Sequence, residues 1–234
     1  MPGSPQHGKE HSLYIRPFMF ASEPFLGVRA AAKAKFCVIA SPAGPYFPDG
    51  PTGISLWASR TQTRAAEGGT GAAKCGGNYA TGLAAQAEAR AHGCDQVLYL
   101  DAVEHEWLEE SGTMNLFLIT AGRELITPGL GTILEGVTRD SILALAEEHG
   151  LTPVERRIGL REVLTRCPEG SITEIFASGT AAAITPIVSI QGEDLDVTVG
   201  SGAPGPNTLA IREHLLGLQY GHRPDSRGWL RRVL

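Results

Sequence analysis

The sequence predicts an α+β fold, in which sheets and helices are not arranged as regular βαβ repeats. Apolar runs with the alternation of strands recur along the chain, and segments with helical periodicity separate some of them without a fixed rhythm. The 234 residues, 42% of them hydrophobic, suffice for a soluble protein with a substantial core. The 29 glycines and 15 prolines are dispersed, which indicates turns between many short elements.

Charge and cysteine usage exclude several classes of function. The net charge is -5 with both signs interspersed, so we expect no nucleic-acid partner and no membrane surface partner. No apolar run approaches membrane length, and the first residues lack a secretory pattern. Four separate cysteines without zinc-ligand spacing suggest reduced thiols in the cytoplasm; they are Cys37, Cys75, Cys94 and Cys167.

The first part of the chain predicts strands separated by loops. Residues 13–20 and 35–40 are strand-like, and residues 54–59 form a further short strand. Residues 41–53 are rich in proline and glycine, which is typical of a linker or a long ordered loop. Residues 78–93 then read as an alanine-rich helix that ends at a glycine.

The remainder predicts an antiparallel meander followed by helices and a strand pair. Thr138 is the expected N-cap of the clearest helix, whose apolar residues recur at helical spacing and end at Gly150. Two strands joined at Ser178–Thr180 are also expected. The expected elements are the meander at 96–128, helices at 137–150, 160–167 and 207–221, and the strand pair at 172–190.

Lys74 lies among glycines and alanines, and three interpretations compete. A phosphate-binding P-loop would need glycine before the lysine and serine or threonine after it, whereas Ala73 and Cys75 occupy these positions. An ordinary surface lysine is a second interpretation. The third is a nucleophilic amine, because small neighbours admit a carbonyl compound and desolvation would lower the lysine pKa. The chemistry of these residues leaves the last two open.

The strings "AAKCGGNY", "EESGTMNLF", "LEGVTRD" and "SGTAAAITP" occur in the order found in branched-chain amino acid aminotransferases, and the chain resembles that family from about Leu13 onwards. The resemblance implies a pyridoxal-phosphate enzyme of fold type IV. It implies that residues 1–40 are the remnant of a small N-terminal α/β domain, 41–53 an interdomain loop and 54–234 the large cofactor-binding domain.

The resemblance also implies roles for individual residues. Lys74 would bind pyridoxal 5'-phosphate and act as the acid and base, while Tyr79 would contact the phenolate oxygen of the ring. Glu110 would face the ring nitrogen; strand alternation is expected to turn only one of Glu109 and Glu110 inward, and without the resemblance both read as solvated. Val137, Thr138 and Thr180 would bind the phosphate, the first two at a helix N-terminus.

The resemblance extends to the substrate, though these residues read otherwise as ordinary core. Leu26 and Val28 would reach the pocket of a partner subunit, and Tyr46 and Phe47 lie in the expected interdomain loop. Arg16 offers a polar group for glutamate within a pocket for Leu, Ile or Val side chains. The residues expected on the substrate side are Tyr14, Arg16, Gln96, Thr113 and Ala181.

We therefore expect a cytoplasmic, homodimeric transaminase that moves the amino group of Leu, Ile or Val to 2-oxoglutarate. Family members carry an N-terminal portion, including an arginine for the cofactor phosphate, that has no counterpart here, so an inactive truncated fragment is one alternative. D-amino acid transaminase or aminodeoxychorismate lyase activity is another. Glu135 replaces the usual proline before Gly136, and its side chain should point away from the phosphate; Ala181–Ile184 replaces the redox CxxC of mammalian mitochondrial relatives.

Overall fold

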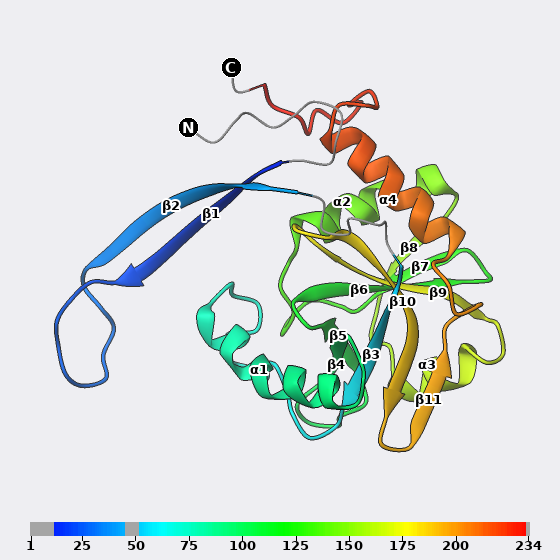
Figure 1. Ribbon diagram of the computed structural model, residues 1–234, viewed down its shortest axis with the longest axis horizontal. Helices are drawn as coiled ribbons and strands as arrows, with labels where there is room; N and C mark the ends of the chain where they lie inside the picture. The colour runs from blue at the N-terminus through cyan, green and yellow to red at the C-terminus, as the bar shows by residue number, and fades with distance from the viewer. Residues whose placement is uncertain (1–11, 45–51, 233–234) are drawn as a thin grey trace. The chain divides into compact units, whose positions relative to one another are not determined.

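The computed structural model describes residues 12–44 and 52–232, and the chain divides into two units, Met1–Pro48 and Asp49–Leu234. The first unit contains an antiparallel hairpin of β1 (Ser12–Ala21) and β2 (Ala34–Ala43) (Figure 1). Both strands confirm the sequence prediction, although most of their large apolar side chains are exposed. The three-part domain division remains a prediction.

The second unit contains a nine-stranded mixed sheet within the described residues. Antiparallel pairs join β4 to β5, β5 to β6 and β6 to β7, which confirms the predicted meander. The strands are β3 (Ile54–Ser59), β4 (Gln96–Leu100), β5 (Leu108–Ser111), β6 (Met114–Thr120), β7 (Glu124–Thr127), β8 (Thr152–Glu155), β9 (Ile172–Gly179), β10 (Ala183–Gly192) and β11 (Leu195–Thr198).

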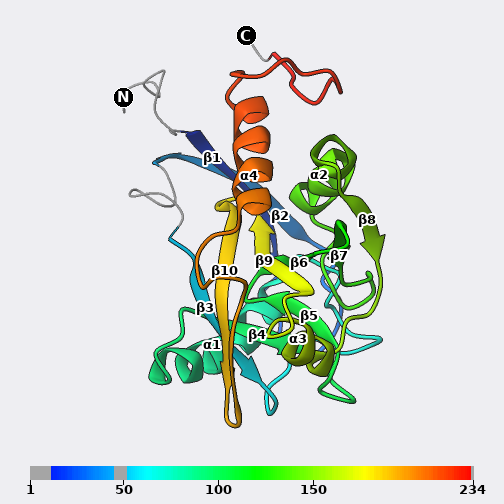
Figure 2. The ribbon, with the colours of Figure 1, turned by 90° about the vertical axis from the view of Figure 1, so that its right-hand side faces the viewer.

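The sheet closes on itself. β9 pairs with both β6 and β10, and β10 leads through β3, β4 and β5 back to β6, so these strands form a ring (Figure 2). Strand alternation then divides the side chains between the inside and the outside of the ring. Leu56 and Leu98 belong to the cluster inside, whereas their neighbours Trp57 and Val97 belong to a separate cluster outside.

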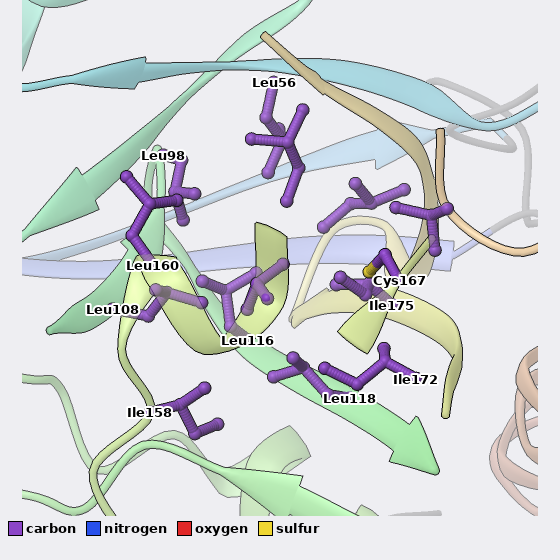
Figure 3. Close-up of a cluster of buried hydrophobic side chains, with 14 of the residues drawn as sticks. Leu56, Leu98, Leu108, Leu116, Leu118, Ile158, Leu160, Cys167, Ile172 and Ile175 are labelled. Atoms are coloured by element: carbon purple, nitrogen blue, oxygen red, sulfur yellow. The ribbon is translucent and has the colours of Figure 1, made fainter. Parts of the chain in front are cut away.

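Helices cover the outside and one end of the ring. Leucine and isoleucine side chains of the strands fill the inside together with α3 (Leu160–Arg166), as Figure 3 shows. Outside, α1 (Gly76–Ala91) packs on β3 and β4. The second outer cluster joins β6 and β9 to α2 (Val137–Leu145), the 3-10 helix η1 (Ala146–His149) and α4 (Pro206–Gln219) (Figure 1).

The helix termini confirm most of the expected stop signals and correct one start signal. Gly93 and Gly150 adopt positive φ angles of 76° and 65° directly after their helices, which only glycine tolerates easily. The N-cap of α2 is Gly136 and not Thr138, and no side chain caps this helix. Thr138 is the second residue inside the helix, because the helical backbone begins directly after Gly136.

Two strands were not predicted from the sequence. β8 has four residues and contains Pro153, and it pairs in parallel with β7 after the intervening helix. β11 also has four residues and pairs with β10. Such short segments carry too little alternation to be distinguished from loops. Within the described ranges, no helix has both the length and the apolar character needed to cross a membrane.

Candidate functional site

Lys74 lies at the end of the loop that connects β3 to α1, one residue before the helix N-cap at Cys75. Its Nζ donates a hydrogen bond of 3.0 Å to Oη of Tyr79, which lies in the first turn of α1. Asn78 fixes the loop, because its Nδ2 donates to the carbonyls of Thr70 and Ala73 at 2.7 and 2.8 Å. The amine and the phenol are therefore held together at the exposed surface of the unit.

A β-bulge in β5 determines the direction of two adjacent carboxylates. Leu100 pairs with Leu108 and Leu98 pairs with Ser111, so Glu109 and Glu110 together lie opposite Tyr99 alone. Both glutamates are buried, at 5% and 3% exposure. The expectation that both are solvated is therefore wrong. The expectation that strand alternation turns only one of them away from solvent is also wrong, because the extra residue interrupts the alternation.

Arg64, which the sequence analysis missed, is the partner of Glu110. Its Nε lies 3.1 Å from Oε2 of Glu110, an ion pair without hydrogen-bond geometry, and both side chains are buried. Its Nη atoms donate to the carbonyls of Gly71 and Thr132, and a side chain at Gly71 would overlap the Thr132 carbonyl. Arg64 thereby joins the loop before Lys74 to the loop before α2.

The pKa values of both buried glutamates are raised. Burial is the main cause for each, because a carboxylate loses hydration when it leaves water. The Arg64 guanidinium opposes the rise at Glu110, and so do the backbone N–H of Leu134, 3.1 Å from Oε1, and the charge of Lys74. Arg64 and the N–H of Leu134 thus favour the ionised form of Glu110 in a place that disfavours charge.

The N-terminus of α2 is attached to Glu110 through Asn115. Asn115 pairs with Glu110 across the β5–β6 ladder, and its Nδ2 donates to the Leu134 carbonyl at 2.9 Å. A side chain at Gly136, the N-cap, would overlap Oδ1 of Asn115. The helix start at Val137 and Thr138 therefore lies beside the sheet row that carries Glu110, and the first N–H groups of a helix lack partners within it.

The same row continues to the β9–β10 hairpin. Ser178 pairs with Asn115, so directly opposite positions place Glu110, Asn115 and Ser178 on one face of three neighbouring strands. Oγ of Ser178 is buried and has no hydrogen-bond partner among the described residues. Thr180 and Ala181 follow in the exposed hairpin loop. Sequence reasoning missed Asn115 and Ser178, although both lie within the strings that carry the resemblance.

The structure brings several of the predicted site residues of the second unit together. A hollow is lined by Tyr79, Glu110 and Thr113, together with Arg64 and Asn78. Its volume is about 20 Å³, which is room for about one water molecule and not for an aromatic ring. Gln96 begins β4 and lies against the turn glycine Gly112, where any side chain would overlap it.

The remaining predicted residues lie in the first unit or outside the described ranges. In the hairpin, Nη2 of Arg16 donates a 2.7 Å hydrogen bond to Oη of Tyr14, while Leu26 and Val28 are fully exposed. Tyr46 and Phe47 lie outside the described residues. Glu135, for which we expected a side chain directed away from the phosphate, is exposed, and no hydrogen bond or ion pair of the described residues involves its side chain.

Comparisons with known proteins identify the family of the chain. Residues 5–190 match the model of the family "Amino-transferase class IV". The chain is 48% identical over 233 residues to the branched-chain-amino-acid aminotransferase of Mycobacterium tuberculosis, covering 98% of this chain and 63% of the relative. The chain thus spans less than two thirds of the length of such curated relatives.

Solved structures give the same result. The Escherichia coli branched-chain amino acid aminotransferase superposes with a TM-score of 0.81 at 36% identity, over 95% of this chain and 70% of that one. A "T.th." branched-chain amino acid aminotransferase, solved with pyridoxamine 5'-phosphate, also gives 0.81, at 31% identity, over 95% and 70% of the two chains. The chain therefore belongs to the class IV aminotransferase family, among the branched-chain amino acid aminotransferases.

Proposed function

We propose that the protein containing this chain is a pyridoxal-phosphate-dependent transaminase, which transfers the amino group of Leu, Ile or Val to 2-oxoglutarate. The observation that carries the proposal is the convergence of three groups. The Lys74 amine is hydrogen-bonded to the Tyr79 phenol, and Tyr79 lines the same hollow as the buried Glu110. An amine, a phenol and a carboxylate suit an aromatic ligand that carries an aldehyde, an acidic ring hydroxyl and a basic ring nitrogen, respectively.

The residues present fit this cofactor chemically. The partnerless, buried Oγ of Ser178 lies in the same row as Glu110, and the first N–H groups of α2 lie beside that row; such donors suit a phosphate. Pyridoxal phosphate supplies an aldehyde that links to amines and a ring that withdraws the electron pair left when an α-proton departs. We assign the phosphate to Val137, Thr138 and Thr180.

Each of the central residues then has a distinct task. Lys74 would hold the cofactor covalently at Nζ and, once released, would accept the substrate's α-proton and deliver it to the C4′ carbon of the cofactor. Tyr79 donates from Oη to the ring hydroxyl oxygen. Glu110 presents an anion to the ring nitrogen and keeps it protonated, and Arg64 supports that role by stabilising the carboxylate.

The substrate side and the assembly are further parts of the proposal. Tyr14, Arg16, Gln96, Thr113 and the Ala181 backbone would line the substrate side, with Arg16 offering a cation to the second carboxylate of glutamate. Leu26 and Val28, which are fully exposed, suit residues that complete the pocket of a partner in a homodimer. The four free thiols are compatible with a cytoplasmic location.

The first test measures cofactor attachment. The 234-residue chain is mixed with pyridoxal phosphate, reduced with borohydride and digested, and the labelled lysine is located by mass spectrometry. We expect the label on Lys74 and its loss in Lys74→Ala. Lys35→Ala is the matched control, because Lys35 is an exposed lysine of β2. Labelling of Lys35 at the same rate as Lys74 would contradict the assignment of Lys74.

The second test measures turnover. Addition of L-leucine should bleach the visible absorption band of the bound cofactor in the wild-type chain, and 2-oxoglutarate should restore it. Bleaching by D-alanine in place of L-leucine would favour a D-amino acid transaminase. If the chain is labelled but no amino acid changes its absorption band, the 234-residue chain binds the cofactor without performing the reaction.

A further inference from the structure

A pair of histidines lies where η1 meets α4, outside the site described above. Nε2 of His149 in η1 lies 3.0 Å from Nδ1 of His214 in α4, and the centres of the two rings are 5.2 Å apart. Both residues are half-buried. Because η1 continues α2 and α4 packs against both, the pair joins two helical segments that are distant in the sequence (Figure 1). Nothing in the proposed transamination uses it.

The contact between the two rings depends on how many protons the pair carries. A neutral imidazole has one N–H donor and one acceptor nitrogen, whereas a protonated ring has two donors and no acceptor. While at least one ring is neutral, one ring can donate to the other across the 3.0 Å contact. When both rings are protonated, two N–H groups and two positive charges face each other, so the hydrogen bond is lost and the rings repel.

The surroundings make a second positive charge unfavourable. Arg123, in the β6–β7 turn, donates from Nη2 to the His149 carbonyl, and Arg223 follows α4. Burial is the main cause of a lowered pKa of His149, and the charge of His214 comes next. Arg223 and Arg123 lower this pKa further, whereas Glu148 opposes them. The pair therefore takes a second proton only at a pH below the ordinary histidine value.

Glu148 connects the pair to the segment that follows α4. Its Oε2 lies 3.8 Å from Nε2 of His214, and its Oε1 accepts hydrogen bonds from Nε and Nη2 of Arg227 at 3.2 and 2.6 Å. Nη2 of Arg227 also donates to the Ala144 carbonyl of α2 at 2.7 Å. The segment at 221–232 is thus attached to α2 and η1 directly beside the histidine contact.

We propose that His149 and His214 form a proton-sensitive contact between η1 and α4, which is kept while at least one ring is neutral and is lost when both are protonated. Loss of the contact loosens the second half of α4 and the segment at 221–232. Leu215 and Leu218 still pack in the outer cluster, so the opening is local and leaves the sheet intact. The contact is complete above the ordinary value of 6.5 and is lost as pH falls through the lowered pKa of His149.

The first measurement follows the ring protons of the histidines by NMR from about pH 8 to about pH 5. We expect the His149 signal to titrate below 6.5 in the wild-type chain and to move back towards 6.5 in His214→Gln, because the charge of the second ring is removed. His92→Gln, at an exposed histidine after α1, is the matched control and should leave the titration of His149 unchanged. An identical titration of His149 in the wild-type chain and in His214→Gln would overturn the proposal.

The second measurement is amide hydrogen exchange of the wild-type chain and His149→Gln, corrected for the intrinsic effect of pH on exchange. Between about pH 7.5 and about pH 5, exchange at 214–219 and 221–232 should rise about tenfold in the wild-type chain, because a hydrogen bond is replaced by repulsion. His149→Gln keeps a donor and an acceptor near the place of Nε2 but takes no proton, so its exchange should not rise.

The remaining outcomes are equally decisive. If His149→Gln does not fold, His214→Asn replaces it, because the asparagine amide lies near the place of Nδ1 and takes no proton either. An equal rise in the wild-type chain and the variant would assign the loosening to other groups. A simultaneous rise in β6 and β9 would mean acid unfolding of the whole unit. Either result, or no rise in the wild-type chain, would overturn the proposal.

Discussion

Glu109 and Glu110 are adjacent in one strand and almost equally buried, yet they have different surroundings. Glu110 is enclosed by Arg64, Asn115 and the Leu134 N–H, and it lines the hollow beside Tyr79. Glu109 bonds only to Thr132, and its other oxygen has no partner in the described part of the chain. Residue type and burial therefore do not determine what a carboxylate does; its immediate partners do.

The bulge in β5 is the origin of this contrast. In a regular strand the two side chains would lie on opposite faces, one of them inside the ring among leucines. With two residues opposite Tyr99, both leave the interior, and each turns towards a different loop. One inserted residue thus gives two buried carboxylates on the outer side of the ring.

Removing the partner of Glu110 should have the largest effect. Arg64→Met leaves a buried carboxylate without its cation, so we expect the free energy of unfolding to fall by about 3–5 kcal/mol in urea titrations. Arg64→Met/Glu110→Met should recover part of the loss. Arg157→Met, at an exposed arginine, should change the free energy by less than about 1 kcal/mol. Equal losses for Arg64 and Arg157 would contradict the importance of the buried pair.

The second prediction compares the two glutamates in catalysis. Glu110→Gln should lower kcat/KM for L-leucine about a hundredfold, because an amide cannot keep a ring nitrogen protonated. Glu109→Gln should change it little, since Glu109 does not line the hollow beside Tyr79. Steady-state kinetics measure both variants. A similar loss of kcat/KM in both would contradict the separate role of Glu110.

The third prediction concerns the turn that follows β4. Asp101 accepts four backbone N–H bonds, which hold its pKa at about 2. Its stabilising effect is therefore complete above the ordinary value of 3.8 and is lost as pH falls towards 2. Asp101→Asn should lower the free energy of unfolding at pH 7 by about 2 kcal/mol. Asp194→Asn, in the exposed β10–β11 turn, is the control and should have no such effect.

The smallest predicted effect is the pH dependence that Glu109 causes. Burial raises its pKa above the ordinary 4.5, so the folded state binds a proton more tightly than the unfolded state does. Its contribution to stability is complete below that value and is lost as pH rises through the raised pKa. Glu109→Gln should therefore flatten the decline of stability with pH, whereas Glu193→Gln should not. A decline unchanged in Glu109→Gln would assign it to other groups.

Local patterns predicted the elements well where a clear stop or turn signal bounded them. The helix that ends at Gly150 and the strand at 54–59 carry enough periodicity and a clear stop or turn signal, and both are present as α2 with η1 and as β3. Lys74, Tyr79 and Glu110 came from the resemblance, because a lysine among small residues is chemically ambiguous. Residue spacing alone did not distinguish a nucleophile from a surface lysine.

By itself, the sequence determined the α+β class, the main helices and strands, and the family of the chain, because periodicity and motif order are local properties of the chain. Only the tertiary structure decided that the sheet closes through β9, that β5 bulges at Glu109, and that Arg64 meets Glu110 across more than forty residues. Register and long-range pairing depend on what fills the interior and which charges must be matched there. Those conditions exist only when all the strands are in place.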